Sequence, residues 1–216
     1  MSGKGGKRMQ TLTINTMQKI ILRLYQNLPR EVYIHQSFTA KNACQLFKKS
    51  NEEQIYPDEI AQICLEGIRL GALYHDAGKI LVPKEVLCKK DLLTEKERSM
   101  IYWHALYGGD IAISLLKESH HKYRQTVWAM AEYHHERWDG QGYPKGLKGK
   151  KIPVAARICA IADSYDAMIS CRPYNKDISK EYACNEIERN AGSQFDPLLA
   201  KLFLSYQKQE DAVLCI

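Results

Sequence analysis

The chain has 216 residues, of which 45% are hydrophobic and 26% are charged. This composition is typical of a globular domain and excludes a largely disordered chain. The formal net charge is +6, and Lys4, Lys7 and Arg8 contribute three of those charges. The rest is too weakly basic to predict a nucleic-acid polymer as partner, although the sign favours a small anionic ligand.

The cysteines and the hydropathy pattern predict the compartment. None of the seven cysteines has CxxC spacing, and Cys159 lies in the apolar run ARICAIAD, so we expect buried thiols rather than disulfides. No apolar run approaches the roughly 18 residues of a membrane span, and no signal peptide is found. We therefore expect a cytoplasmic protein that does not bind a membrane.

Helical periodicity begins after the first ten residues. Residues 1–10 are rich in glycine and lysine, which predicts a disordered tail or a remnant of an expression vector. Apolar residues then recur at helical spacing and predict an N-terminal helix over 11–28, a second helix over 32–50 and a third over 57–74.

The second half of the chain continues the helical pattern. Thr94 and Glu97 have the spacing of a capping box. The apolar stripe that follows comprises Met100, Ile101, Tyr107 and Ile111. Further helices are predicted in RQTVWAMAEYHH, IPVAARICAIADSYDAMIS, DISKEYACNEIERNAG and DPLLAKLFLSY. Because no alternating strand pattern and no linker appear, we predict an all-α fold, a single-domain helical bundle.

Histidines and acids at helix ends and inside apolar runs are the main chemical signal. The set comprises Glu31, His35, His75, Asp76, His104, His134, His135 and Asp163. Burying such groups without partners costs several kcal/mol each, and a cluster of divalent cations would give each a partner. Adjacent ligands such as His134 and His135 point about 100° apart on a helix, which suits two cations better than one. Mixed imidazole and carboxylate ligation favours iron or manganese, with zinc, nickel or cobalt as alternatives.

Each of these residues has a simpler interpretation when taken alone. Most His-Asp and His-His pairs are on the surface, and His120–His121 in the polar run KESHHKYR are interpreted as a solvated loop. A lone His104 is more often a satisfied core histidine, and a lone Asp163 is more often part of a buried ion pair. Their joint occurrence on apolar faces favours the metal site.

Longer motifs resemble those of the HD-GYP family. These are HDAGK at 75–79, HHERWDGQGYP at 134–144, IPVAARICAIADSYDA, and RPY. The family is a branch of the HD metal-dependent phosphohydrolases, and its members hydrolyse cyclic di-GMP. The resemblance covers residues 29–206, includes ILVPKEVL, LTEKE and FDP, and implies an HD-GYP domain of the HD-domain type over 29–216.

The resemblance implies a role for individual residues. The family's metal ligands fall on His35, His75, Asp76, His104, His134, His135 and Asp163. Glu31 matches an extra glutamate that some members use for a third ion, so two or three divalent ions are expected, and three are favoured. Lys79 and Arg172 match residues that contact substrate phosphate.

Some positions depart from the family pattern. The basic residue often found three positions after Arg172 is replaced by Asn175, and Lys176, one further on, is the candidate for that substrate contact. In the glycine-rich stretch DGQGYPKGLKG, Tyr143 is expected either to stack near a base or to pack structurally. Few residues precede the match, so a regulatory signal is expected from a signalling partner protein or a second copy of the chain.

Together these features predict a metal-dependent phosphodiesterase that opens cyclic di-GMP to linear pGpG, and onward to GMP. A hydroxide held between two ions would attack phosphorus, with Asp76 and Lys79 as catalytic residues. The same chemistry on cyclic GMP-AMP is an open alternative, and so is a non-catalytic cyclic-dinucleotide receptor. The complete GYP segment disfavours a general nucleotide phosphohydrolase.

Overall fold

The computed structural model describes residues 16, 18–170 and 180–213. Within these ranges the chain has no β-strand, and the all-α prediction is confirmed. The α-helices are α2 (Arg30–Glu52), α3 (Pro57–Ile60), α4 (Leu65–Tyr74), α5 (Lys84–Leu87), α6 (Glu95–Leu106), α7 (Gly108–Ser114), α8 (Arg124–Tyr133), α9 (Val154–Ser170), α10 (Lys180–Arg189) and α11 (Pro197–Val213). The 3-10 helices are η1 (Ala77–Leu81), η2 (Glu118–Tyr123) and η3 (Gly149–Lys151).

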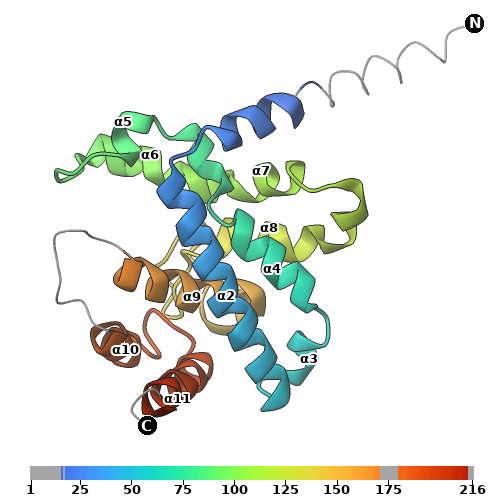
Figure 1. The fold of residues 1–216 in the computed structure, drawn as a ribbon, viewed down its shortest axis with the longest axis vertical. Coiled ribbons are helices and arrows are strands. Elements are labelled where there is room, and N and C mark those ends of the chain that lie inside the picture. Colours follow the sequence, from blue (N-terminus) through green and yellow to red (C-terminus); the bar gives the residue numbers. More distant parts are fainter. Residues whose placement is uncertain (1–15, 17, 171–179, 214–216) are drawn as a thin grey trace, which may run out of the picture.

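Helix α2 is the centre of the packing. It contacts α4 and α9 along its length, and α4 contacts α8 in turn (Figure 1). Ala43, Leu46 and Phe47 of α2 are buried, because their spacing puts them on one face of the helix. Gly71 lets α4 approach α8 closely, since a Cβ at this position would lie 2.3 Å from the sulfur of Met130.

Two apolar clusters flank this arrangement. The larger cluster contains residues of α2, α4, α8, α9, α10 and α11, with Phe203 fully buried. The smaller cluster joins the N-terminal helix to α7 and α8 through Tyr25, Leu28 and Ile111. None of the helices described combines the length and the apolarity that crossing a bilayer requires.

Two predicted helices are interrupted in the structure. The helix expected over 57–74 is divided, because Cys64 is extended (φ −132°, ψ 161°) and α4 begins after it. Both parts bury apolar residues in the same core, so the spacing alone could not reveal the break. The stripe expected through Tyr107 is also wrong: α6 ends before it, and Tyr107 is 51% exposed. The chain turns there, and Gly109 in α7 packs closely against the ring of Trp128, which lies 2.5 Å from where a Cβ would be.

The predicted helix starts agree better with the structure than the predicted helix lengths do. The capping box is confirmed: the Thr94 hydroxyl accepts from the Glu97 amide, and the Glu97 carboxylate accepts from the Thr94 amide at 2.7 Å. Residues 18–26 are helical within the predicted 11–28 segment. The predicted tail, 1–10, lies outside the described residues, and the predicted domain limits stay predictions.

A buried ion pair joins α9 to the start of α11. Arg157 is 3% exposed and donates to Asp196 at 2.8 Å and to the Ile152 carbonyl at 2.8 Å. The same carboxylate accepts from the Tyr56 hydroxyl at 3.1 Å and from the amide of Leu199 at 3.2 Å. With these bonds, both charges are compensated away from water.

We predict that Asp196→Ala destabilises the protein by about 3 kcal/mol or more, because it leaves Arg157 buried with fewer partners. The matched control is Glu52→Ala, which breaks the exposed pair with Lys49 and should cost less than about 1 kcal/mol. Urea unfolding measures both. Equal losses in the two variants would contradict the importance of the buried pair.

Candidate metal centre

Seven side chains of metal-ligating type converge within the bundle. They are His35 in α2, His75 at the end of α4, Asp76 just before η1, His104 in α6, His134 and His135 at the end of α8, and Asp163 in α9. They form three overlapping groups, in each of which the ligand atoms lie within 4.8 Å of one another. The groups are His35–His75–Asp76, His75–His134–Asp163 and His104–His134–His135.

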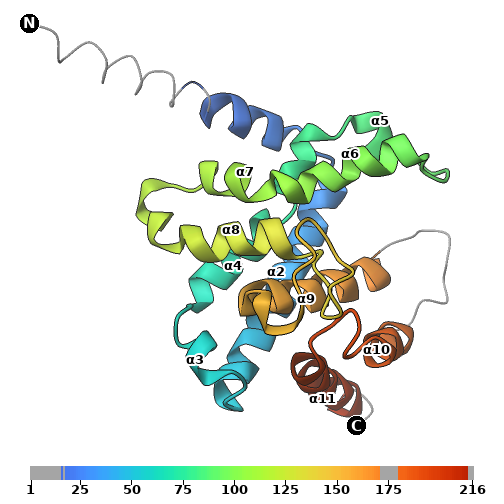
Figure 2. The same cartoon turned by 180° about the vertical axis from the view of Figure 1, so that it is seen from behind.

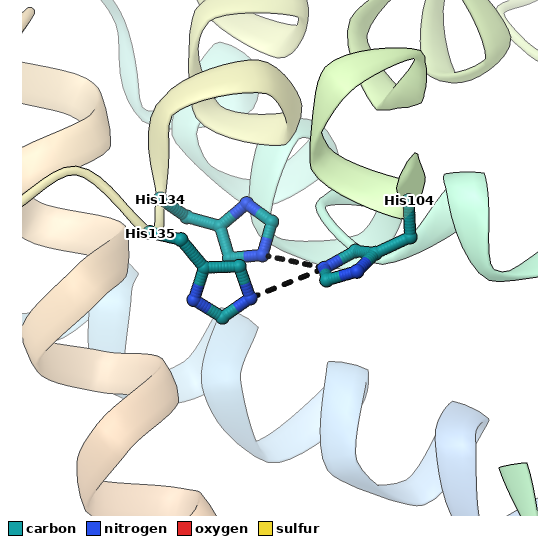
Figure 3. Close-up of side chains that lie close together, drawn as sticks. All are labelled: His104, His134 and His135. Carbon is teal, nitrogen blue, oxygen red and sulfur yellow. Dashed lines mark hydrogen bonds between the residues drawn. The ribbon is translucent and has the colours of Figure 1, made fainter. Parts of the chain in front are cut away.

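The all-histidine group is closely packed. Figure 3 shows His104 facing both His134 and His135, and its Nε2 lies 3.3 Å and 3.1 Å from their Nε2 atoms. His104 and His134 are buried. Ring nitrogens at these distances must share a proton or a cation, because two lone pairs facing each other repel.

Asp76 lies between the groups. Its Oδ1 is 3.4 Å from His104 Nε2, whereas its Oδ2 is 3.4 Å from His75 Nε2. Lys79 donates to Oδ2 at 2.5 Å from one turn of η1 away. Asp76 is only 2% exposed, so its two oxygens are directed at two different sets of nitrogen donors. This is the arrangement of a carboxylate that can bind two cations.

Backbone carbonyls orient the buried imidazoles. Nδ1 of His75 lies 2.7 Å from the carbonyl oxygen of Ala72, and Nδ1 of His134 lies 3.1 Å from that of Met130. His104 makes the same bond one turn earlier in its own helix. A carbonyl only accepts, so each Nδ1 carries a proton and each Nε2 faces the centre, where it can bind a cation once it has no proton of its own.

His35 is held by a carboxylate instead. Its Nδ1 lies 2.5 Å from Asp166 Oδ2, and its Nε2 lies 2.8 Å from Asp163 Oδ1. Asp166 is fully buried and was not among the metal-site residues predicted from the sequence. Its spacing could have identified it, since Asp166 follows Asp163 by three residues and therefore lies on the same face of α9.

Burial and charge set the protonation of the centre. Burial lowers the pKa of His135 to about 3. Burial alone would raise the pKa of Asp76, but the charges of Lys79 and His75 outweigh it and hold that pKa well below its ordinary value. Burial opposes the protonation of His35, yet its carboxylate partners raise its pKa to about 9. Burial alone would also raise the pKa of Asp163, but its hydrogen bond to His35 and the charge of His75 hold that pKa well below its ordinary value. Asp76 and Asp163 are thus ionised, and a bound cation would replace the proton of His35.

A divalent cation fits this donor set. Nε2 of His75 is fully buried and makes no hydrogen bond within the part of the chain that the structure describes. It is 3.4 Å from Asp76 and 3.5 Å from Asp163. Buried polar atoms without partners are costly, and a cation among these atoms would pair all of them at once.

The remaining predicted residues differ in their placement. Glu31 is exposed and belongs to none of the three groups. Arg172 and Lys176 lie outside the described residues, so their contacts with substrate stay predictions. Tyr143 lies between two rings, stacked on His135 at 4.8 Å and on Tyr102 at 4.3 Å between ring centres.

The paired histidines do not diverge as a helix would require. Helix α8 ends at Tyr133, so His134 caps the helix and His135 lies beyond it. The expected angle of about 100° applies only within a continuous helix. Here both rings reach His104, and their centres are 4.1 Å apart. The expectation that their side chains diverge by about 100° is therefore wrong, although only His134 also joins His75 and Asp163.

The loop after the paired histidines folds back on them, since the amide of Tyr143 donates to the carbonyl oxygen of His135 at 3.2 Å. Figure 2 shows this loop beside the end of α8. Buried Glu136 accepts from the amides of Lys145 at 2.7 Å and Leu147 at 2.9 Å. Gly142 packs so closely that a Cβ would lie 2.5 Å from the carbonyl oxygen of His135. Glu136 was missed in the sequence, because no spacing reveals which loop amides a glutamate will bind.

Comparison with known proteins identifies the family. Residues 35–199 match the HD domain family. The chain belongs to the HD domain family. It is 37% identical over 150 residues to a cyclic di-GMP phosphodiesterase of Thermotoga maritima, a match that covers 69% of this chain and 40% of the relative. It is 38% identical over 146 residues to the cyclic di-GMP phosphodiesterase response regulator RpfG of Xanthomonas campestris, covering 68% of this chain and 38% of that protein.

Two further comparisons with this HD domain are a relative named for a different cyclic dinucleotide and a solved structure. The chain is 36% identical over 132 residues to a 3'3'-cGAMP-specific phosphodiesterase of Vibrio cholerae, covering 61% of this chain and 24% of that one. A solved HDG"Y"P protein of Bdellovibrio bacteriovorus shares the fold, with a TM-score of 0.60, 18% identity, and coverage of 85% of this chain and 55% of that chain. The resemblance to the HD-GYP branch is confirmed.

We predict that Gly78→Ala disturbs the metal centre. A Cβ on Gly78 would lie 2.0 Å from the backbone oxygen of His104, so α6 must move away and carry His104 with it. We expect a loss of about 1–3 kcal/mol in the free energy of unfolding and less bound metal per chain, measured by thermal unfolding and elemental analysis.

Gly67→Ala is the matched control, because a Cβ there would lie at an ordinary 3.4 Å from Thr126. This substitution in α4 should be neutral or stabilising by up to about 1 kcal/mol. The packing argument fails if Gly78→Ala keeps both the stability and the metal content of Gly67→Ala.

Proposed function

We propose that this protein is a metal-dependent phosphodiesterase that hydrolyses cyclic di-GMP to pGpG, and onward to GMP. The observation that carries the proposal is the convergence of five imidazoles and two carboxylates in three overlapping groups, two of which share His75. The buried Nε2 of His75 makes no hydrogen bond to any residue that the structure describes. The relatives named as cyclic di-GMP phosphodiesterases support the substrate. The chain spans 40% and 38% of their lengths.

The residues that would hold divalent cations are His35, His75, Asp76, His104, His134, His135 and Asp163. Bound cations would activate water and polarise the phosphodiester as Lewis acids. Imidazole with carboxylate ligation favours iron or manganese. Zinc, nickel or cobalt, and the choice between two ions and three, stay open.

Asp76 and Lys79 are the proposed catalytic residues of the chain itself. The Lys79 ammonium lies 2.5 Å from Asp76 and keeps 24% of its side chain exposed. It is therefore placed where an anionic phosphate can reach it, and it would offset the charge that grows on the phosphoryl oxygens. The carbonyl bonds to His75 and His134 hold the donors in place without rearrangement.

Cyclic GMP-AMP is a second candidate substrate, because relatives in Vibrio cholerae are named as specific for it. A non-catalytic receptor is disfavoured, since a protein that only binds nucleotide does not need the whole ligand set. We also propose a role in cyclic-dinucleotide signalling. The free thiols of Cys44 and Cys159 support a reducing, cytoplasmic location.

The test is hydrolysis of each cyclic dinucleotide by the metal-loaded protein, followed by chromatography of the products. We expect turnover of cyclic di-GMP. The double variant His75→Ala, Asp76→Ala should lose bound metal and at least about a hundredfold in kcat, because several kcal/mol of transition-state stabilisation disappear.

His121→Ala is the control, because His121 is exposed on η2 and belongs to none of the three groups. It should keep both metal and turnover. Tight nucleotide binding without turnover would favour the receptor. If the protein neither binds nor hydrolyses a cyclic dinucleotide, both functions are excluded.

A further inference from the structure

An aromatic stack leads from the metal centre to the surface of α6. Tyr143 stacks on the metal-centre residue His135, with an interplanar angle of 28°, and on Tyr102, with an angle of 25°. Tyr102 is 38% exposed, so its ring ends the stack at the surface. Because Tyr102 is fixed by its stacking on Tyr143 and is partly open to solvent, it is a platform on which a further ring can stack.

Two hollows flank Tyr102, and both are lined by Arg98. One of about 290 Å³ is bounded by Leu93, Arg98, Ile101, Tyr102 and Tyr143. The other, of about 400 Å³, is bounded by Arg98, Ser99, Tyr102 and Trp103. Trp103 is 47% exposed. Apolar and aromatic walls with one cationic group are the composition of a ligand site rather than of a solvated helix face.

The Arg98 side chain is held in place, but the terminal nitrogens of its guanidinium can still donate hydrogen bonds. Its Nε donates to the carbonyl oxygen of Leu93 at 3.2 Å. The Arg98 side chain makes no other hydrogen bond or ion pair among residues 16, 18–170 and 180–213. A guanidinium fixed at Nε keeps its two terminal nitrogens for an acceptor pair in the hollow.

We infer that Tyr102 and Arg98 form a guanine-binding subsite beside the metal centre, in which the base stacks on Tyr102 and pairs with Arg98. The inference rests on the proposed function. One nucleotide of a cyclic dinucleotide carries both a phosphodiester and a base, and Tyr102 is two stacking steps from His135. The phosphodiester can therefore lie at the centre while its base lies over α6.

The two residues have separable roles. Stacking on Tyr102 accepts any base, because every base has a π-face. Arginine distinguishes bases, because guanine presents two acceptors, O6 and N7, where adenine presents an acceptor and a donor. Tyr102 therefore contributes affinity, and Arg98 contributes the preference for guanine.

The experiment compares Tyr102→Ala, Arg98→Ala and a control, Tyr107→Ala, in the metal-loaded protein. Tyr107 is 51% exposed just beyond the end of the same helix and lines neither hollow. The probes are non-hydrolysable phosphorothioate analogues of cyclic di-GMP and cyclic di-AMP, and calorimetry gives their Kd values. Circular dichroism confirms that each variant is folded.

Tyr102→Ala should raise both Kd values by roughly tenfold or more, and Tyr102→Phe should restore them. Arg98→Ala should raise the Kd of the guanine analogue by roughly tenfold and leave that of the adenine analogue unchanged. Arg98→Lys should behave like Arg98→Ala, because an ammonium lacks the paired donors.

If Tyr102→Ala and Arg98→Ala have the same Kd values as Tyr107→Ala, the proposed subsite is overturned. Equal losses for both analogues in Arg98→Ala would overturn the pairing with guanine. If the wild type binds with the expected pattern but does not hydrolyse cyclic di-GMP, the proposed function fails and the subsite stands. If the wild type binds neither analogue, both fail.

Discussion

The buried carboxylate of Asp76, surrounded by imidazoles, is the constraint on which the rest of the structure depends. Asp76 is 2% exposed, with His104 and His75 each 3.4 Å from one of its oxygens. Taking an ionised carboxylate out of water is expensive unless positive charge and hydrogen bonds compensate it. Lys79 supplies part of that charge at 2.5 Å. A bound cation would supply the rest, and on this ground we propose that the cluster is a metal site and not only a core polar network.

Close backbone packing is what lets side chains distant in sequence reach this point. Gly78 sets the short helix after Asp76 directly against the backbone of His104, and Gly71 brings α4 onto α8. Glu136 binds two loop amides and turns the glycine-rich loop back over the paired histidines. The same loop carries Tyr143 to α6, where it stacks on Tyr102. The geometry of the centre and of the neighbouring hollows therefore has a common origin in a few tight contacts.

Periodicity predicted the helical fold and the inward direction of His104, because both follow from the apolar spacing. It did not predict the break between α3 and α4 at Cys64 or the turn at Tyr107. Apolar spacing indicates which face of a helix is buried, but it does not show whether the helix is continuous. The convergence of His35, His134 and Asp163 was inferred from their chemistry and the resemblance. The partner of His35, Asp166, and the aromatic contact between Tyr102 and Tyr143 depend on tertiary packing, which no local pattern encodes.

The most direct test of the account is elemental analysis of protein purified without oxygen, for the wild type and for His75→Ala. Since donors from five helices meet around the buried Nε2 of His75, the account predicts about two or more divalent ions per wild-type chain. It also predicts a clear loss of metal in the folded His75→Ala variant. A folded wild-type chain that binds no divalent metal, even after incubation with iron and manganese, would contradict it.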